Sequence, residues 1–263
     1  MSIESRNEVV SEMATKKPQY GNWVSAKLVY IPGAVAFLFL GLSIVLPVLI
    51  IVAVILFLPF FYFAYARYKF SPGGGNIQAM VQNLVLDHLD WDGEGKVLDI
   101  GCGNASLTIS IAKKYPNAEI TGIDYWGGMW EYSKDVCEMN AEIEGISKRV
   151  TFEKASASAL PFDDETFDVA VSNLVFHEVK GSRDKKDVIK EALRVVRKGG
   201  NFVFQDLFLW KMIYGDVDDL LETIRSWGID RVEFVDTSVL DFIPKALRLP
   251  FMLGTIGILN GRK

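Results

Sequence analysis

Hydrophobic and polar positions divide this chain of 263 residues into two parts. Between Leu28 and Ala66 the chain contains no Asp, Glu, Lys, Arg or His. From about residue 96 onward, short apolar runs alternate with stretches whose apolar residues recur every three or four positions. The first pattern is typical of membrane-spanning helices, and the second predicts strands that alternate with helices.

The alternating part predicts an α/β sheet. Its apolar runs predict strands at 96–100, 118–124, 150–154, 167–173, 201–206 and 231–236, followed by a last apolar run at 255–259. The stretches between them predict helices at 105–114, 131–142, 184–197 and 216–227. Such alternation favours a mostly parallel sheet with helices on both faces. Ligands bind to sheets of this kind at the carboxyl ends of the strands.

The charge-free segment is too long for one straight membrane span. A helix rises 1.5 Å per residue, so residues 28–66 would extend about 58 Å, whereas the hydrocarbon core of a bilayer is about 30 Å thick. Two spans of about 18–20 residues fit this thickness. We expect the break near Gly41-Leu42-Ser43, with Ser43 as the N-cap of the second helix and Pro47 in its first turn.

The charges that flank this segment agree with a hairpin. Lys16, Lys17 and Lys27 precede it, and Arg67 and Lys69 follow it. A hairpin places both clusters on one side of the membrane, as the positive-inside rule requires, and predicts that the domain that follows is cytoplasmic. One tilted, kinked span and a buried hairpin of a soluble protein stay open as alternatives. A cleaved signal peptide is disfavoured because the run is too long and begins too late.

These patterns predict four segments. They are a cytoplasmic N-terminal segment at 1–27, a transmembrane helical hairpin at 28–68, a glycine-rich linker at 69–80 and a globular domain at 81–263. The three consecutive glycines 73–75 favour a flexible joint, although a loop that folds over the ligand site is an alternative.

The stretch VLDIGCGNAS, at 97–106, indicates a cofactor loop. An apolar strand stops at Gly101-Cys102-Gly103 and a helical pattern follows, and glycines let the backbone approach a ligand closely. The dinucleotide fingerprint G-x-G-x-x-G is incomplete because its last position is Ser106. Asp124 ends the next predicted strand, where a carboxylate can accept both hydroxyls of a ribose. These features fit any adenosine cofactor, NAD included.

Composition narrows the context. The net charge is −5, and no basic stripe alternates with aromatic residues, so we expect no nucleic-acid partner. The two cysteines are Cys102 and Cys137. A disulfide at Cys102 would distort the glycine loop, so we interpret both as reduced thiols in a reducing compartment. The sequence predicts no metal site.

Further motifs follow in a fixed order. After VLDIGCG and ITGID come LPFDDETFD at 160–168, His177 behind the fourth predicted strand, and RKGG before the fifth. This ordered set resembles the class I S-adenosylmethionine-dependent methyltransferases, in the branch that acts on small molecules, lipids or quinones. The resemblance spans about 76–206. It implies a Rossmann-like seven-stranded sheet, S-adenosylmethionine as cofactor and S-adenosylhomocysteine as product, with an NAD oxidoreductase as the alternative.

The resemblance also implies residue roles. It assigns cofactor binding to Asp99, Gly101, Cys102, Gly103, Asp124, Tyr125, Ser156, Ala157 and Asn173. In this assignment the first strand and its loop line the methionine end and the ribose, Asp124 holds the ribose hydroxyls, and Asn173 faces the methionine part. Tyr125 lies beside the adenine, and Ala157 offers its N–H to the adenine ring. The family usually has an acidic residue where this chain has Ser156, whose hydroxyl can accept a hydrogen bond only without charge assistance.

Methyl transfer to a protonated nucleophile needs a base as well as alignment. His177 is the candidate base because its pKa range suits proton transfer. Asp206 ends the fifth predicted strand and is a second candidate, facing the substrate. A His177 that shapes the pocket without moving a proton is the alternative.

The stretch 237–253 mixes apolar residues with Lys245, Arg248 and two prolines. It predicts either docking on a lipid interface or a partly buried connection. We therefore expect an integral membrane methyltransferase that acts on a lipophilic acceptor: a phospholipid amine, a quinone or isoprenoid, or a hydrophobic thiol or phenol. Two alternatives are a tethered enzyme with a cytosolic small-molecule or protein substrate, and a non-catalytic S-adenosylmethionine-binding scaffold. Small residues within 33–41 leave a homo-oligomer open.

Overall fold

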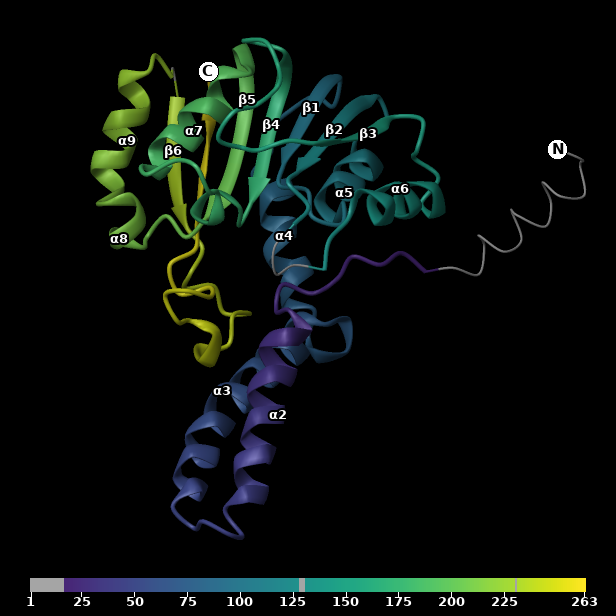
Figure 1. Cartoon of the computed structure of the whole chain (residues 1–263). Helices are drawn as coiled ribbons and strands as arrows, with labels where there is room; N and C mark the ends of the chain where they lie inside the picture. The colour runs from purple at the N-terminus through teal and green to yellow at the C-terminus, as the bar shows by residue number, and fades with distance from the viewer. Residues whose placement is uncertain (1–16, 128–130, 230) are drawn as a thin grey trace, which may run out of the picture. The chain divides into compact units, whose positions relative to one another are not determined.

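The computed structural model describes residues 17–127, 131–229 and 231–263. Lys16 of the predicted basic cluster and most of the predicted segment 1–27 lie outside the described residues. The described chain divides into two units (Figure 1). The sheet unit comprises 17–20, 82–126 and the described residues from 132 onward, and the apolar unit comprises 21–81 together with 127 and 131.

The sheet unit contains seven strands in the order β3-β2-β1-β4-β5-β7-β6. They are β1 (Gly95–Ile100), β2 (Ala118–Asp124), β3 (Val150–Lys154), β4 (Phe167–Asn173), β5 (Val196–Asp206), β6 (Arg231–Asp236) and β7 (Gly257–Arg262). The first five pair in parallel, and β7 runs antiparallel to both β5 and β6. The order reverses between β1 and β4, which opens a ligand crevice at their carboxyl ends. The predicted seven-stranded Rossmann-like sheet is confirmed.

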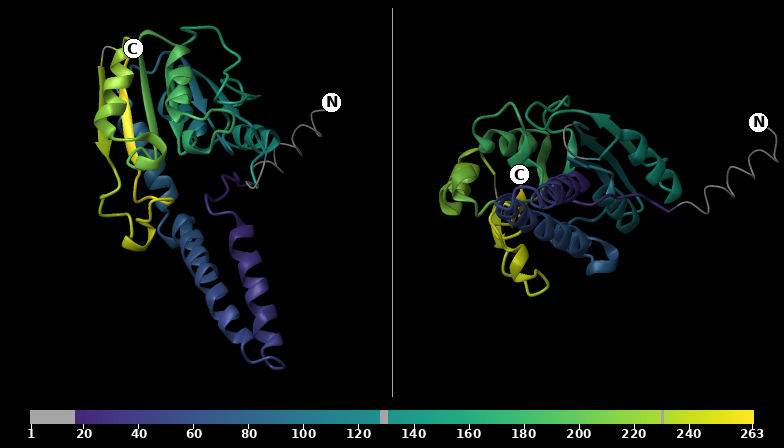
Figure 2. Two further views of the ribbon diagram at one scale, coloured as in Figure 1. Left: turned by 60° about the vertical axis from the view of Figure 1, so that its left-hand side comes forward. Right: turned by 60° about the horizontal axis from the view of Figure 1, so that its bottom comes forward.

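Helices cover both faces of this sheet (Figure 2). They are α4 (Ile77–Asp87), α5 (Ser106–Lys114), α6 (Lys134–Ile143), α7 (Lys185–Arg194), α8 (Lys211–Tyr214) and α9 (Val217–Ser226). Successive strand residues point to opposite faces, so Val97 packs with α5 and α6 while Leu98 packs with α7 and α9. Two separate hydrophobic cores result, one on each side of the strands.

The beginning of β5 differs from the prediction. The helix expected at 184–197 ends at Arg194, and the strand expected at 201 begins at Val196. Val196 is buried and pairs with Phe167, and pairing resumes only at Val169 with Asn201. The intervening residues form an irregularity in the ladder, and Gly199 adopts φ +74° there. The two glycines therefore mark a bulge within a strand, where the sequence indicated the end of a helix.

The apolar unit contains two helices, α2 (Ala26–Leu42) and α3 (Leu49–Phe70). The chain breaks after Leu42, near the expected position, but the predicted roles of Ser43 and Pro47 are wrong. Ser43 caps the end of α2, because its N–H donates to the Phe39 carbonyl at 2.9 Å and its Oγ to the Leu40 carbonyl at 2.6 Å. Pro47 lies in the turn before α3. By length and composition α3 could cross a membrane, whereas α2, at 17 residues, is shorter.

Small residues bring the two helices together. A Cβ added at Gly33 would lie 2.6 Å from Phe60 Cδ2, and Ala36 and Ala53 are fully buried. The opposite surfaces of both helices are apolar and exposed, as at Phe37 and Ile55. Large exposed apolar surfaces are in general typical of regions that contact another molecule or a lipid phase.

The predicted linker 69–80 is largely helical. Residue 69 still belongs to α3, and α4 begins at Ile77, so the connection is Ser71–Asn76 with a short 3-10 turn at Pro72–Gly74. The N–H groups of Gly74 and Asn76 both donate to the Ser71 carbonyl at 3.0 Å. A Cβ at Gly74 would lie 1.7 Å from the Tyr68 carbonyl oxygen, so this glycine permits the tight turn.

The residues that precede α2 are tied to the sheet unit. Gln19 and Asn140 of α6 exchange two hydrogen bonds of 2.7 and 3.1 Å. The Tyr20 hydroxyl donates to Glu144 Oε1 at 2.7 Å. Because α3 leads into α4, both flanks of the apolar unit connect to the sheet unit.

Candidate active site

The loop that follows β1 folds back on the end of β2. The N–H groups of Gly101 and Cys102 donate to the Ile123 carbonyl at 2.7 and 2.9 Å. Gly101 adopts φ +76°, and a Cβ there would lie 2.1 Å from Val175 Cγ2. The first glycine is therefore required both by its backbone conformation and by the packing of Val175. No signal in the sequence pointed to Val175.

Asp124 joins this loop to β2. Its Oδ2 accepts a hydrogen bond from the Gly103 N–H at 3.0 Å, and its Oδ1 accepts one from the Trp126 N–H at 2.8 Å. Burial raises the pKa of Asp124, although these N–H groups oppose the rise. A carboxylate offers about four lone-pair sites, so each oxygen can still accept a ribose hydroxyl. Trp126, which the sequence did not single out, closes the loop by donating Nε1–H to the Gly103 carbonyl at 2.9 Å.

Asp99 is buried at the end of β1. Its side chain is 1% exposed, and its Oδ2 accepts a hydrogen bond from Thr108 Oγ1 at 2.5 Å. Burial raises the pKa of Asp99 to about 7, and the nearby charge of Asp124 adds to the rise. A cation beside this carboxylate would offset the cost of burying its charge. A cofactor bound as predicted would bring the ammonium group of its methionine end beside this carboxylate.

The two cysteines are free and buried. Burial raises the pKa of Cys102 well above its ordinary value, and the Cys137 Sγ–H donates to the Gly103 carbonyl at 3.0 Å. A thiol held protonated is not nucleophilic. Cys102 is therefore a filler of the loop wall, and Cys137 braces the loop from α6.

The residues predicted at the adenine end lie at the carboxyl ends of β2 and β3. Tyr125 is 67% exposed, and Lys154 Nζ lies 5.2 Å from the centre of its ring. Ala157 is buried within the turn at 156–159. The Ser156 hydroxyl lies 2.8 Å from the Ser158 hydroxyl and accepts a hydrogen bond from the Ser158 N–H at 3.3 Å. The Ser156 hydroxyl therefore already stabilises its own turn. This makes it a weaker candidate for a hydrogen bond to the adenine amino group.

Three amide atoms of two neighbouring side chains lack hydrogen-bond partners among the described residues. Asn173 ends β4 and pairs in register with Gln205 of β5, so both side chains lie on one face of the sheet. Asn173 Oδ1 and both amide atoms of Gln205 are buried without a hydrogen bond anywhere in the described part of the chain. Buried amides are normally satisfied, so these atoms are candidates for hydrogen bonds to a ligand or to water. Asn173 ends β4 as predicted, its role at the methionine part stays a prediction, and Gln205 was missed by the sequence analysis.

His177 and Asp206, which were predicted separately, form one pair. His177 Nδ1 lies 2.8 Å from Asp206 Oδ1, and Asp206 is fully buried. Asp206 also accepts hydrogen bonds from the N–H groups of Phe176 at 2.8 Å and Leu207 at 2.7 Å. The pair lies at the same edge of the sheet as the glycine loop, since β4 and β5 both end there.

The electrostatics of this pair favour an ionised Asp206. Burial acts to lower the pKa of His177, but the charge and hydrogen bond of Asp206 outweigh it and raise the pKa. Burial likewise acts to raise the pKa of Asp206, but His177 and the backbone N–H groups hold it below its ordinary value. Tyr214 is buried nearby, and its pKa is raised well above the ordinary value by burial and by the charge of Asp206. The other ring nitrogen of the histidine, Nε2, lies 3.7 Å from Glu178 Oε1.

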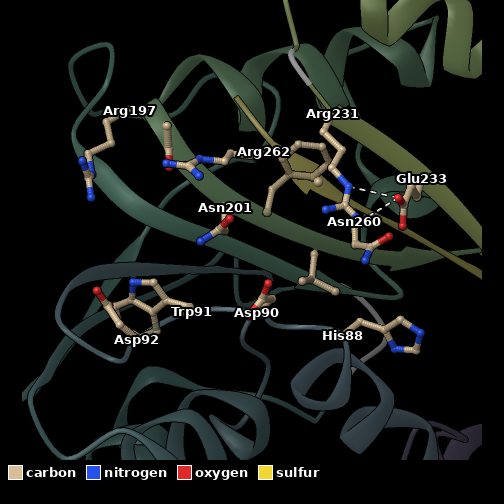
Figure 3. A pocket seen from close by; sticks show the side chains of 14 residues that line it. His88, Asp90, Trp91, Asp92, Arg197, Asn201, Arg231, Glu233, Asn260 and Arg262 are labelled. Atoms are coloured by element: carbon tan, nitrogen blue, oxygen red, sulfur yellow. Dashed lines mark hydrogen bonds and ion pairs between the residues drawn. The ribbon is translucent and has the colours of Figure 1, made fainter.

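The opposite edge of the sheet holds a polar cavity of about 570 Å³ (Figure 3). It lies between the segment before β1, which contributes Asp90, and the beginnings of β5 and β6. Arg197 pairs with Asp168 and Arg231 with Glu233, so two of its three arginines are neutralised. The cavity contains none of the predicted site residues. Within 17–127, 131–229 and 231–263, no group of His, Cys, Asp or Glu could hold a metal ion.

The reversed strand order, the glycine loop and the two strand-end carboxylates together define a class I S-adenosylmethionine-dependent methyltransferase domain. The comparison with protein families agrees. A methyltransferase-domain model matches residues 92–244, more than half of the chain, and the chain belongs to this family.

Curated relatives include the demethylmenaquinone methyltransferase of Bacillus subtilis, which is 36% identical over 109 residues, 41% of this chain and 43% of that protein. The ubiquinone/menaquinone biosynthesis C-methyltransferase UbiE of Geobacter sulfurreducens is 30% identical over 132 residues, 47% of this chain and 48% of that protein. The chain thus spans about half or less of the length of these relatives.

Solved structures share the fold. The geranyl diphosphate C-methyltransferase from Streptomyces coelicolor A3(2), in complex with S-adenosyl-L-homocysteine, has a TM-score of 0.53 at 13% identity, covering 72% of this chain and 80% of that chain. The [4+2]-cyclase SpnF has a TM-score of 0.53 at 22% identity, covering 70% of this chain and 80% of that chain. At these identities the likeness shows the fold alone, and one neighbour is named for a cyclisation.

Proposed function

We propose that this chain is a membrane-attached methyltransferase that transfers a methyl group from S-adenosylmethionine to a lipophilic acceptor. The observation that carries the proposal is the hydrogen-bonded pair of His177 and Asp206 at the sheet edge that also holds Asp99 and Asp124. Cofactor-binding groups and a candidate base thus meet at one edge of the sheet. This arrangement supports a catalytic domain over a non-catalytic scaffold.

S-adenosylmethionine supplies an electrophilic methyl group on a sulfonium. The residues of the chain do the rest. Asp99 and the unsatisfied Asn173 oxygen would hold the methionine end, and Asp124 would hold the ribose hydroxyls. His177 Nε2 takes a proton from the incoming nucleophile, while Asp206 keeps the other ring nitrogen protonated and stabilises the charge that develops on the ring.

Several features support attachment to a membrane. The helix α3 is long and apolar enough to cross a bilayer, and both helices expose apolar side chains over their outer surfaces. Residues Gln19 and Tyr20 bind α6, and α3 leads into α4, so both flanks of the apolar unit belong to the sheet unit. A hairpin that enters and leaves the membrane on the cytoplasmic side satisfies this connectivity, whereas a single span does not.

The acceptor that fits best is a phenol or hydroquinone on a lipophilic body. A base is needed only if the nucleophile arrives protonated, which is true of a phenol at neutral pH. The buried amide of Gln205 offers both a donor and an acceptor for a ring oxygen. Relatives named for menaquinone and ubiquinone biosynthesis agree with this choice. A phospholipid amine and a hydrophobic thiol are the competing acceptors.

The test is an assay with methyl-labelled S-adenosylmethionine. The full chain, reconstituted in vesicles, is incubated with total membrane lipid extract, and label is followed into the organic phase and identified by mass spectrometry. We expect label in a quinone or phenol fraction, and its loss in His177→Ala. Label that remains in water-soluble products would overturn the lipophilic acceptor. Cofactor binding without any labelled product would overturn methyl transfer itself.

A further inference from the structure

The connection between β6 and β7, residues 237–256, lies at the edge of the sheet that holds the candidate active site. It begins where β6 ends and returns to the beginning of the antiparallel β7 (Figures 1 and 2). The Leu209 N–H donates to the Thr255 carbonyl at 2.9 Å, which joins the connection to the segment between β5 and α8. This part of the sheet unit is therefore adjacent to Asp206, where β5 ends.

Large apolar side chains are exposed on this part of the sheet unit. Four of them lie on the connection or on α8: Met212 (89% exposed), Val239 (62%), Leu249 (38%) and Phe251 (50%). Among the described residues of the sheet unit, Tyr125 of the cofactor site is the other large apolar side chain exposed to a comparable degree. Exposed apolar residues are thus concentrated at the edge of the sheet that also holds His177 and Asp206.

The exposed positions are held outward by an ordered inner layer. Ile243, Leu247 and Leu253 of the same connection are buried. The Arg248 guanidinium donates to the Ile243 and Leu240 carbonyls at 3.2 and 3.1 Å. Since the connection has its own core, its exposed apolar side chains belong to an ordered surface and not to a collapsed loop.

The charge of the connection suits an anionic partner. Between residues 237 and 256 it contains Lys245 and Arg248 against one acidic residue, Asp241, although the whole chain carries −5. Lys245 is exposed and belongs to the same connection as Val239, Leu249 and Phe251. Exposed apolar side chains with a lysine on the same connection fit the interface of a bilayer. There the apolar side chains can insert among the lipids, and the cation can pair with anionic headgroups.

We propose that Met212, Val239, Leu249 and Phe251, here called the apolar rim, insert into an anionic bilayer interface and hold the active-site edge against the membrane. The inference rests on the proposed function, because it assumes a chain attached to a membrane through α2 and α3. It adds that the sheet unit itself touches lipid, so that a lipophilic acceptor passes from the bilayer to His177 without crossing water.

The test uses spin labels on the full chain in vesicles of phosphatidylcholine and phosphatidylglycerol. Single cysteines replace Phe251, Val239, Val54 of α3, or Glu119 at the opposite edge of the sheet; the native cysteines are buried. Collisions with oxygen, which concentrates in lipid, are compared with collisions with a water-soluble nickel chelate. We expect labels at 251 and 239 to favour oxygen about fivefold more than the label at 119.

The outcomes separate the two proposals. If the labels at 251 and 119 behave alike while the label at 54 reports lipid, the apolar rim is not a membrane contact, but the hairpin is. If the label at 54 also reports water, the membrane attachment of the proposed function fails. If the label at 251 is shielded from both reagents, a second copy or a protein partner covers the rim, and lipid docking is overturned.

A kinetic experiment complements the labels. Phe251→Ser combined with Val239→Ser should raise the apparent KM for an acceptor dissolved in the bilayer about fivefold, with kcat unchanged. The KM for a short, water-soluble analogue of the acceptor should not change, because the variant leaves the catalytic residues intact. Glu119→Gln is the matched surface control. Equal KM changes for both acceptors would show a structural effect and overturn the inference.

Discussion

His177 Nδ1 lies 2.8 Å from Asp206 Oδ1, across 29 residues of sequence. Asp206 is fully buried and holds His177 in one orientation, since it also accepts a hydrogen bond from the Phe176 N–H, just before the histidine, and is itself fixed by the Leu207 N–H. The carboxylate therefore fixes the tautomer in which Nδ1 is protonated and Nε2 is free to accept a proton. The pair has the geometry of an oriented general base.

Asp206→Asn should show whether His177 acts as an oriented base or only packs in the pocket. Removing the charge removes the main cause of the raised pKa of His177, so the pKa should fall. A base works when it is neutral, so wild-type activity should rise with pH through the raised pKa, and the rise should occur at lower pH in the variant. The maximal rate should fall about 10²–10⁴-fold. The measurement is kcat as a function of pH.

Glu178→Gln is the control for this experiment. Its carboxylate lies 3.7 Å from His177 Nε2 and is half exposed, so it contributes less to the pKa of the histidine. Its pH profile should move little, and its rate should stay within about threefold of wild type. If Asp206→Asn leaves the pH profile in place, His177 does not act as the base.

Asp99 predicts that cofactor affinity depends on pH. Its pKa is raised to about 7 by burial, so near neutrality half of the molecules carry a protonated Asp99 that cannot pair with the methionine ammonium. Affinity should rise with pH and level off above 7, with binding at pH 6 about tenfold weaker than at pH 8. Calorimetric titration with S-adenosylmethionine measures this ratio. Asp99→Asn should bind weakly at both values, and an unchanged ratio in that variant would place the titrating group elsewhere.

Asp99 should also lower the free energy of unfolding of the cofactor-free protein at high pH. The pKa of Asp99 is higher in the folded chain than the ordinary 3.8, so the folded state holds its proton more tightly and loses stability as pH rises from about 4 to about 7. Asp99→Asn should therefore raise the free energy of unfolding at pH 8 by about 4 kcal/mol, the equivalent of about three pKa units, with little difference at pH 4. Denaturant unfolding of the cofactor-free protein at the two values tests the sign. A variant that is less stable at pH 8 would contradict the burial argument.

The sequence predicted the sheet well because its strands are continuous apolar runs. The bounds of β2, β3, β4 and β6 match the predictions, since buried parallel strands leave little ambiguity of pattern. The start of β5 was missed because Gly199 and Gly200 look the same whether they end a helix or form a bulge. Only the pairing of Val196 with Phe167 distinguishes the two.

The site was predictable where a residue ends a strand. Asp99, Asp124, Asn173 and Asp206 could be placed at one edge in this way, and their spatial meeting follows from parallel topology. Side-chain orientation was not predictable. The link between Ser156 and Ser158, the packing of Val175 on Gly101 and the unsatisfied amide of Gln205 depend on contacts that no local pattern encodes.

A substitution at Ser156 is expected to increase affinity for S-adenosylmethionine. Its hydroxyl is engaged with Ser158, so it offers at most a neutral acceptor to the adenine amino group. Ser156→Asp would supply a charge-assisted acceptor and should tighten S-adenosylmethionine binding about three- to tenfold. Ser156→Ala, the matched control, should weaken it less than about threefold. Both dissociation constants are measured calorimetrically, and weaker binding by the aspartate variant would show that the adenine lies elsewhere.

Gly33 predicts how the two apolar helices pack. A side chain at this position would meet the Phe60 ring, whereas a Cβ at Gly41 has no neighbour within 4 Å. Gly33→Leu should lower the stability of the apolar unit by about 1–3 kcal/mol, and Gly41→Leu should leave it nearly unchanged. Unfolding of each variant in detergent micelles gives the comparison. Equal effects of the two substitutions would contradict the close packing of α2 on α3.

A substitution at Gln205 should change both the free energy of unfolding and the kinetics with the acceptor. Both atoms of its amide are buried without a partner in the described chain, which costs free energy in the absence of a ligand. Gln205→Met has a similar volume and no polar atoms, so it should raise the free energy of unfolding by about 1 kcal/mol. The same change should lower kcat/KM for the acceptor about tenfold, because a lipophilic oxygen acceptor would lose its hydrogen bonds, while affinity for S-adenosylmethionine stays unchanged. Gln205→Glu, which keeps the size and one acceptor oxygen, is the comparison variant. A less stable Gln205→Met enzyme with normal kinetics would show that the amide serves the fold, through bound water, and not the acceptor.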